Sequence, residues 1–88
     1  MRGAEIIRSA RKHCVEYADL RHAVANWVYA SDLDMGRPLR ILYLGPDRAG
    51  NLLEIVTIER DDGTELAIHA MKMRRAYEEL LPRELSDE

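Results

Sequence analysis

Cysteine and long apolar runs are both scarce in this sequence, and each scarcity excludes a class of protein. Cys14 is the only cysteine among the 88 residues, so an internal disulfide and a multi-cysteine zinc site are both excluded. No apolar stretch approaches the roughly 18–20 residues that span a bilayer, and residues 1–5 do not lead into the apolar core of a signal peptide. We therefore expect a cytoplasmic protein in which Cys14 is a small buried apolar residue.

Strong chemical motifs are absent as well. The sequence contains no P-loop, no dinucleotide-binding fingerprint, no HExxH zinc motif and no nucleophile elbow. A metal site built from His13, His22 and His69 would need three widely separated segments to converge. We therefore expect neither a metal nor a cofactor, and enzyme classes that depend on these motifs are disfavoured.

Length and composition favour one folded domain. Hydrophobic residues make up 47% of the chain and charged residues 33%, which is ordinary for a globular protein and too apolar for disorder. A chain of 88 residues can build one modest core. We assign residues 1–83 to a single α+β domain and the acidic residues 84–88 to a flexible tail.

The charge of the chain is slightly negative, but its basic residues are unevenly spread. Thirteen basic and 16 acidic residues give a net charge of −3, which does not favour binding of a polyanion by the surface as a whole. Any nucleic-acid site must therefore be a local basic patch. Basic residues cluster at Arg8–His13 and at Lys72–Arg75, although each cluster alone is also compatible with a solvated face.

The N-terminal third has the pattern of a helix. The segment Ala4–Ala30 contains neither Gly nor Pro, and its apolar residues recur at steps of three and four. This pattern fits one long helix or two helices joined near residues 13–15, and periodicity does not choose between them. Trp27 falls on the apolar stripe, so we predict that it is buried in the core. Residues 31–38 include Gly and Pro and are predicted to form a loop.

Three β-strands in a meander are predicted after this loop. They cover residues 39–44, 52–60 and 64–70, with turn clusters at 45–50 and 61–63. A two-residue type I′ turn at Asp62–Gly63 predicts that paired residue numbers in the second hairpin sum to 125. On that register one face carries the core residues Leu53, Ile55, Thr57, Leu66, Ile68 and Ala70. A short closing helix is predicted over residues 73–81, ending at Pro82.

The opposite face of the second hairpin is mixed in polarity and is the candidate site. The predicted register gives it three cross-strand pairs: Arg60–Glu65, Val56–His69 and Glu54–Met71. If the first hairpin keeps Ile41 and Tyr43 in the core, Arg40 joins this face. The sequence therefore predicts a neighbourhood of Arg40, Glu54 and His69, conditional on the register of the first hairpin.

Residues 69–77 hold the densest group of titratable and basic side chains, where a strand leads into a helix. RNA cleavage by attack of a 2′-hydroxyl needs a base, cations for the phosphate and an acid for the leaving oxygen. His69 or Glu54 can serve as the base, and Tyr77 as a stacking surface or weak acid. The catalytic candidates are therefore His69, Glu54, Arg74 and Tyr77. The candidate RNA-binding residues are Arg40, Lys72, Arg75 and Lys12. In the competing interpretation the cations lie on a solvated helix face and Tyr77 belongs to the core.

Three short segments carry a resemblance to a known family. Residues 12–17 read KHCVEY, similar to a K-H-G-[IV]-x-[FY] junction between two helices. Residues 42–55 resemble a hairpin with the pattern G-x-x-x-x-G-x-L-L-x-[IV], and residues 68–75 resemble a strand end with a basic continuation. These are features of small bacterial toxins of the RelE superfamily, particularly the BrnT-like branch. Cys14 replaces the junction Gly, and Met71 stands where BrnT-like toxins usually have an arginine thought to contact RNA.

The resemblance implies a fold of two N-terminal helices, a three-stranded antiparallel meander and a short C-terminal helix. It also implies the toxin of a type II toxin–antitoxin system, a metal-independent endoribonuclease that cleaves mRNA and inhibits translation. The implied partners are RNA, free or on the ribosome, and a cognate antitoxin protein. Formation of a homodimer is a further possibility. The alternative is a non-catalytic protein- or RNA-binding module of the same fold. A small-molecule enzyme is disfavoured because so short a chain leaves little volume for an enclosed pocket.

Overall fold

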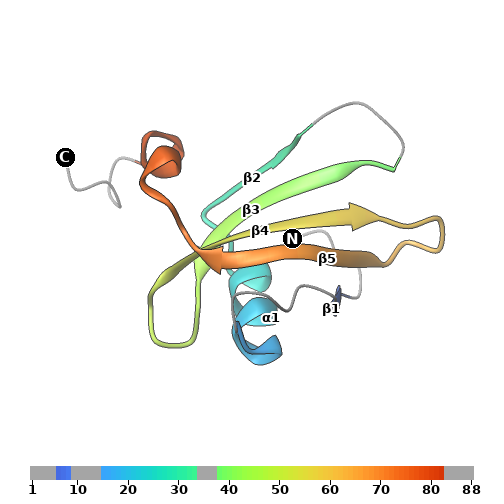
Figure 1. The fold of residues 1–88 in the computed structure, drawn as a ribbon, viewed down its shortest axis with the longest axis horizontal. Coiled ribbons are helices and arrows are strands. Elements are labelled where there is room, and N and C mark those ends of the chain that lie inside the picture. The colour runs from blue at the N-terminus through green and yellow to red at the C-terminus, as the bar shows by residue number, and fades with distance from the viewer. Residues whose placement is uncertain (1–5, 9–14, 34–37, 83–88) are drawn as a thin grey trace.

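The computed structural model of the chain describes residues 6–8, 15–33 and 38–82 (Figure 1). These residues form an α+β fold, as the sequence predicts. Its elements, in chain order, are β1 (Ile6–Arg8), α1 (Tyr17–Ala25), β2 (Tyr29–Asp32), β3 (Arg40–Pro46), β4 (Leu52–Glu59), β5 (Glu65–Lys72) and a 3₁₀ helix, η1 (Arg75–Leu80).

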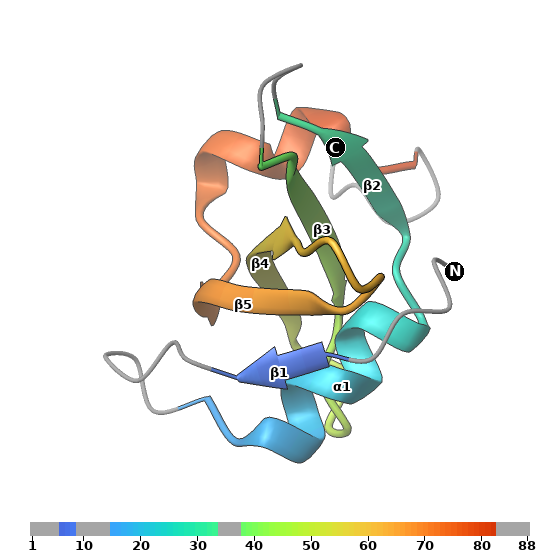
Figure 2. The same ribbon diagram turned by 90° about the vertical axis from the view of Figure 1, so that its right-hand side faces the viewer.

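The described strands form one sheet in the order β1-β5-β4-β3-β2. Strands β2 to β5 pair antiparallel with their neighbours, and β1 pairs parallel with β5. Helix α1 lies against one side of this strongly curved sheet, which we call the helix face (Figure 2). The side chains that point away from α1 form what we call the second face.

The core lies between α1 and the helix face. It consists of buried residues from the helix and from three strands: Leu20, Ala23, Val24, Ile41, Tyr43, Leu53, Ile55, Ala67 and Ala70. Gly45 lets the helix approach β3 closely, because a Cβ atom there would collide with the backbone carbonyl of Ala23. Ile41, Tyr43 and Ile55 belong to this core, which confirms the inward faces that the sequence predicts for β3 and β4. On the opposite face, Leu42 and Leu44 are also buried.

The helical prediction for the N-terminal third is wrong in most of its described part. Residues 6–8 form a strand, α1 covers only nine residues, and the chain enters β2 at Tyr29. Trp27 lies beyond the end of α1 and is 39% exposed, so its predicted burial is wrong. Apolar residues at helical spacing did not identify the strands, because pairing with distant β5 and β3 decides the conformation of these segments. The predicted helix junction at 13–15 falls mainly on residues outside the described ones, as does Cys14.

The three-stranded meander is confirmed, with small shifts in its ends. Strand β3 begins one residue later than predicted and continues to Pro46, and β4 ends at Glu59. Strand β5 continues to Lys72. The predicted loop over 31–38 is partly wrong, because β2 includes Ser31 and Asp32 and forms an additional edge strand beside β3.

The second hairpin differs from its predicted register near the turn. The turn is a three-residue loop, closed by hydrogen bonds from Arg60 N to Thr64 O and from Gly63 N to Arg60 O, with Gly63 at a φ of 89°. Paired residue numbers beside it therefore sum to 124, as in Ile58–Leu66. A β-bulge beyond Thr57 restores the predicted sum of 125 from Val56–His69 onward.

The bulge reverses the faces of the first half of β5. Glu65 lies opposite Glu59, not Arg60, and is buried on the helix face. Leu66 moves to the second face, and Ile68 is 39% exposed, so both are wrongly assigned to the core by the sequence. The Glu65 carboxylate accepts hydrogen bonds from the Tyr43 hydroxyl at 2.7 Å and the Thr57 hydroxyl at 2.8 Å. Because a buried carboxylate needs hydrogen-bond donors, these two buried hydroxyls favour the inward orientation of Glu65.

The closing helix is present but is a 3₁₀ helix of six residues in place of the α-helix predicted over 73–81. No side chain caps its first turn, and none of its residues is fully buried. Such short segments commonly adopt 3₁₀ geometry because neither capping nor core packing supports a longer α-helix.

Candidate functional site

The second face brings Glu54 and His69 together through strand pairing. Val56 lies opposite His69 and Glu54 lies opposite Met71, so Glu54 and His69 are diagonal neighbours on that face. Strand β5 then ends at Lys72, and the turn that follows brings Arg74 next to Glu54. The candidate site is therefore built by two adjacent strands and the entry to η1.

Glu54 is the centre of this cluster. Its Oε2 atom lies 2.9 Å from His69 Nε2 and accepts a 2.7 Å hydrogen bond from Arg74 Nη2. Its Oε1 atom accepts a 2.8 Å bond from the Arg74 backbone N–H, and Arg74 Nε lies 3.1 Å from both oxygens. The Glu54 side chain is 1% exposed, whereas His69 is 29% and Arg74 is 57% exposed. One buried carboxylate thus holds two side chains that reach the surface.

The Glu54 carboxylate is ionised. Burial acts to raise its pKa, but hydrogen bonds from the Arg74 side chain, the Arg74 backbone and His69 outweigh burial and lower the pKa below its usual value. In turn, the hydrogen bond to Glu54 raises the pKa of Arg74. Because both Glu54 oxygens already accept several bonds, this carboxylate is suited to positioning its neighbours and not to accepting a substrate proton.

The bond to Glu54 also fixes the tautomer of His69. An ionised carboxylate only accepts hydrogen bonds, so Nε2 of His69 must be the donor. In the neutral ring, Nδ1 is then the nitrogen that carries no proton. His69 therefore has the orientation of a general acid or base held by a carboxylate.

Tyr77 adds an aromatic ring next to the cation. The guanidinium carbon of Arg74 lies 5.9 Å from the centre of the Tyr77 ring, within the range of a cation–π interaction. Tyr77 comes from η1 and is half-buried. All four catalytic candidates, His69, Glu54, Arg74 and Tyr77, are thus brought together in one cluster.

The candidate RNA-binding residues are more dispersed. Arg40 lies on the second face, as predicted, but opposite Ile58, so four residues of β4, or about 13 Å, separate that position from Glu54. Leu44 and not Arg40 lies opposite Glu54. Lys72 is exposed and lies opposite Leu53, and Arg75 is the exposed first residue of η1. Lys12 lies outside the described residues.

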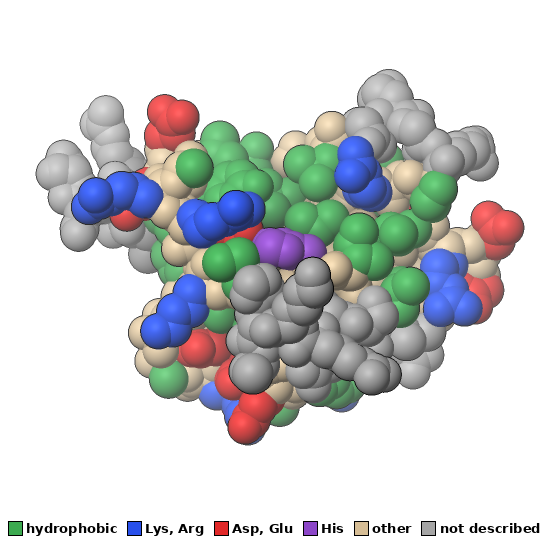
Figure 3. Space-filling view, in the orientation of Figure 1, with side chains coloured by type: hydrophobic (Ala, Val, Ile, Leu, Met, Phe, Trp, Pro, Cys, Tyr) green, Lys and Arg blue, Asp and Glu red, His purple; other side chains and the backbone are tan. Residues whose placement is uncertain are grey.

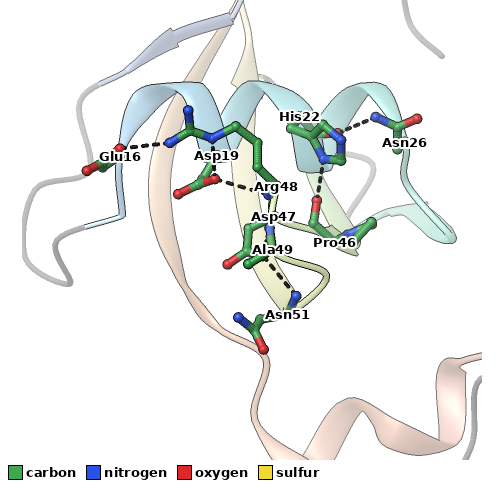
Figure 4. A network of polar contacts seen from close by, with 9 residues as sticks. All are labelled: Glu16, Asp19, His22, Asn26, Pro46, Asp47, Arg48, Ala49 and Asn51. Atoms are coloured by element: carbon green, nitrogen blue, oxygen red, sulfur yellow. Dashed lines mark hydrogen bonds and ion pairs between the residues drawn. The ribbon is translucent and has the colours of Figure 1, made fainter.

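A second polar network fastens the β3–β4 turn to α1 (Figure 4). Arg48 binds Asp19 through its backbone N–H and its Nε atom, and binds Glu16 through Nη2 at 2.8 Å. Hydrogen bonds from Arg48 lower the pKa of Asp19. His22 Nδ1 lies 2.9 Å from the carbonyl oxygen of Pro46. Sequence analysis did not predict this network, because it joins residues 24 to 32 positions apart in the chain. Its role is to hold the turn on the helix.

The surface around the site mixes basic and apolar side chains. In the view of Figure 3, a histidine lies near the centre, with basic side chains beside it and apolar side chains around it.

Within residues 6–8, 15–33 and 38–82, no group of three or more His, Cys, Asp or Glu residues is arranged to hold a metal ion. In the same segments, no helix has the length and apolar character needed to cross a membrane.

Comparison of the chain with protein-family models, with curated proteins and with solved structures finds no match. The chemistry of the cluster around Glu54 is therefore the basis for a functional proposal.

Proposed function

We propose that this chain is a metal-independent endoribonuclease that acts as the toxin of a type II toxin–antitoxin system. The observation that carries the proposal is the cluster in which buried Glu54 orients His69 and Arg74 beside Tyr77. It offers an imidazole, a cation that can bind phosphate and an aromatic ring, the groups that metal-independent RNA cleavage uses. The sequence resemblance to RelE-like toxins adds the biological setting.

In the proposed reaction, Nδ1 of His69 takes the proton of a ribose 2′-hydroxyl. The 2′-oxygen attacks the adjacent phosphorus, the bond from phosphorus to the 5′-oxygen breaks, and a 2′,3′-cyclic phosphate forms. Arg74 binds the phosphate as negative charge develops on it. The Tyr77 hydroxyl gives a proton to the leaving 5′-oxygen. The proton held on Nδ1 of His69 then passes through water to the Tyr77 oxygen, which restores both groups. Glu54 keeps Nε2 of His69 protonated and stabilises the imidazolium.

Purified protein incubated with a short synthetic RNA tests the catalytic proposal. We expect cleavage with cyclic-phosphate ends, and His69→Ala and Arg74→Ala should each lower the rate by about 10²–10⁴. The matched control is Arg21→Ala, which removes an exposed cation from α1, far in sequence from the site, and should cleave at the wild-type rate. Equal rates in all three variants would show that the cluster is not the catalytic site.

Expression in a bacterial host tests the biological role. Induction should arrest growth and bulk translation, and His69→Ala and Arg74→Ala should relieve the arrest far more than Arg21→Ala. Coexpression of a neighbouring antitoxin gene should restore growth. Growth unaffected by the wild-type chain would contradict the toxin role.

A non-catalytic RNA- or protein-binding module is the second candidate. It is favoured by Met71, a half-buried apolar residue opposite Glu54 at a position where BrnT-like toxins usually carry an arginine. RNA that binds the purified protein but stays intact would support this alternative.

A further inference from the structure

Strand β2 adds an aromatic side chain to the second face. Tyr29 pairs with Leu44 on β3, and Leu44 pairs with Glu54 on β4. Side chains that are paired across neighbouring antiparallel strands point to the same side of the sheet. Tyr29 therefore lies in the same row as Glu54, two strands away, at a distance of about 10 Å in the hydrogen-bonding direction.

The environment of Tyr29 differs from that of Tyr43 on the neighbouring strand. Tyr43 is 0% exposed, and its hydroxyl donates a hydrogen bond to Glu65. Tyr29 is half-buried, and its hydroxyl makes no hydrogen bond to the residues that the structure describes. Among those residues no buried polar side-chain atom lacks a partner, so the Tyr29 hydroxyl reaches solvent. Tyr29 is therefore accessible to a ligand, whereas Tyr43 is a core residue.

The residues between Tyr29 and the Glu54 cluster are buried and apolar. Leu44, which separates Tyr29 from Glu54 in the row, is 0% exposed. In the adjacent row, Ser31 on β2 pairs with Leu42, which is 3% exposed. Strands β2 and β3 contribute no charged side chain to these two rows, so the charge lies at the Glu54 end. A ligand that extends from the cluster to Tyr29 therefore needs a charged group at one end and a neutral group at the other.

The charged end of this surface can hold a phosphate. Glu54 accepts hydrogen bonds from Nε and Nη2 of Arg74, which leaves the Nη1 donors of this half-exposed side chain for a second anion. Arg74 can therefore bind a phosphate while it stays bonded to Glu54. A nucleic-acid strand has the required distribution of charge, because each phosphate is joined through a sugar to an uncharged base. Bases stack on aromatic rings such as that of Tyr29.

We infer that Tyr29 is a base-stacking residue of this site and binds an unpaired base of a nucleic-acid strand whose phosphate is held by Arg74. Cleavage of that strand rests on the proposed function, whereas stacking of the base does not require the strand to be cut.

A single-stranded oligothymidylate tests the inference without cleavage, because DNA lacks the 2′-hydroxyl nucleophile. In nuclear magnetic resonance spectra, the oligonucleotide should shift the ring signals of Tyr29 and the Nε–H signal of Arg74. The control probe is the same oligonucleotide paired with its complement, whose bases already stack on one another, and it should leave the Tyr29 signals unchanged. Tyr29 signals that do not respond to the single strand, or that respond equally to the duplex, would overturn the inference.

Two variants of Tyr29 separate stacking from packing. Tyr29→Leu keeps an apolar side chain but removes the ring, and it should weaken binding of the oligothymidylate about tenfold, or by about 1.4 kcal/mol. Tyr29→Phe retains the ring and should recover the binding that Tyr29→Leu loses. The matched control is Tyr17→Leu, which removes another half-buried tyrosine from α1 on the other side of the sheet and should bind like the wild type. Thermal melts identify the folded variants, and wild-type binding by folded Tyr29→Leu would overturn the inference.

Kinetics with RNA separate this inference from the proposed function. Tyr29→Leu should raise KM about tenfold and leave kcat unchanged, because the stacked base is held equally in the ground state and in the transition state. RNA cleavage by Tyr29→Leu with the KM of the wild type would remove Tyr29 from the site and leave the nuclease proposal intact. A single strand that binds at Tyr29 but stays uncut when it is RNA would overturn the nuclease and leave the base-stacking site.

Discussion

The two faces of the sheet each bury one glutamate, and the two acids have different partners. On the helix face, Glu65 is held by the hydroxyls of Tyr43 and Thr57, both of which are 0% exposed. On the second face, Glu54 is held by His69 and Arg74, both of which reach solvent. A carboxylate that is enclosed by neutral hydroxyl groups contributes to the packing of the core and to its unique arrangement. A carboxylate linked to accessible titratable groups can serve chemistry.

The contrast predicts that damage to the helix face lowers stability most. Ile55→Ala should lower the free energy of unfolding by about 2–5 kcal/mol, because Ile55 is fully buried against α1. Val56→Ala changes the adjacent, half-buried residue on the second face and should cost about 1 kcal/mol. Urea unfolding of both variants measures the difference. Equal costs would mean that the two faces contribute alike to the core.

Removing one hydroxyl tests the sealed network on the helix face. Tyr43→Phe leaves Glu65 with one hydroxyl donor fewer and should cost about 1–3 kcal/mol. Binding or cleavage of RNA by the folded fraction should not change, because Tyr43 does not reach the second face. A folded Tyr43→Phe protein that had lost RNA cleavage would break the proposed division between the faces.

The second face should give stability a distinct dependence on pH. The pKa of Glu54 is lower in the folded chain than its ordinary value of 4.5, so ionised Glu54 stabilises the fold above about pH 4.5. This contribution is lost as the pH falls below 4.5 through the folded pKa. Glu54→Gln removes it, so the free energy of unfolding should fall less steeply between pH 5 and pH 3 than in the wild type. Urea unfolding across this range provides the measurement, and parallel curves would argue against the Glu54 contribution.

The smallest effect is expected at the exposed end of the second face. Ile68→Ala should change the free energy of unfolding by less than about 0.5 kcal/mol, because Ile68 lies at the bulge and is 39% exposed. A thermal melt of the isolated chain is sufficient to check this. A large loss of stability would mean that Ile68 packs against the rest of the chain more closely than its exposure indicates.

Local pattern in the sequence predicted the antiparallel meander well. Alternation in residues 39–70 identified three strands and the inward side of β3 and β4, because a side chain on a pleated strand must point to one face or the other. The pairing of Glu54 with Met71 and of Val56 with His69 was also correct, which is why the Glu54–His69 contact could be expected. Arg74 joined the cluster through a turn whose geometry the sequence did not specify.

The errors arose where distant contacts outweigh local pattern. Trp27 fell on a helical stripe but lies beyond the helix, because the following residues pair with β3. Asp62–Gly63 favoured a two-residue turn, but a three-residue loop and a compensating bulge form instead. That choice lets Glu65 meet Tyr43 and Thr57, which are 22 and 8 residues away in the chain.

The sequence by itself determined the α+β class, the three strands of the meander and the pairing that brings Glu54 and His69 together, because side-chain alternation acts over a few positions. Only the tertiary structure decided which of the two glutamates orients His69 and Arg74, and which one is enclosed in the core. The physical reason is that burial of an acid depends on the donors around it in space. Those donors come from residues that only the completed sheet brings together.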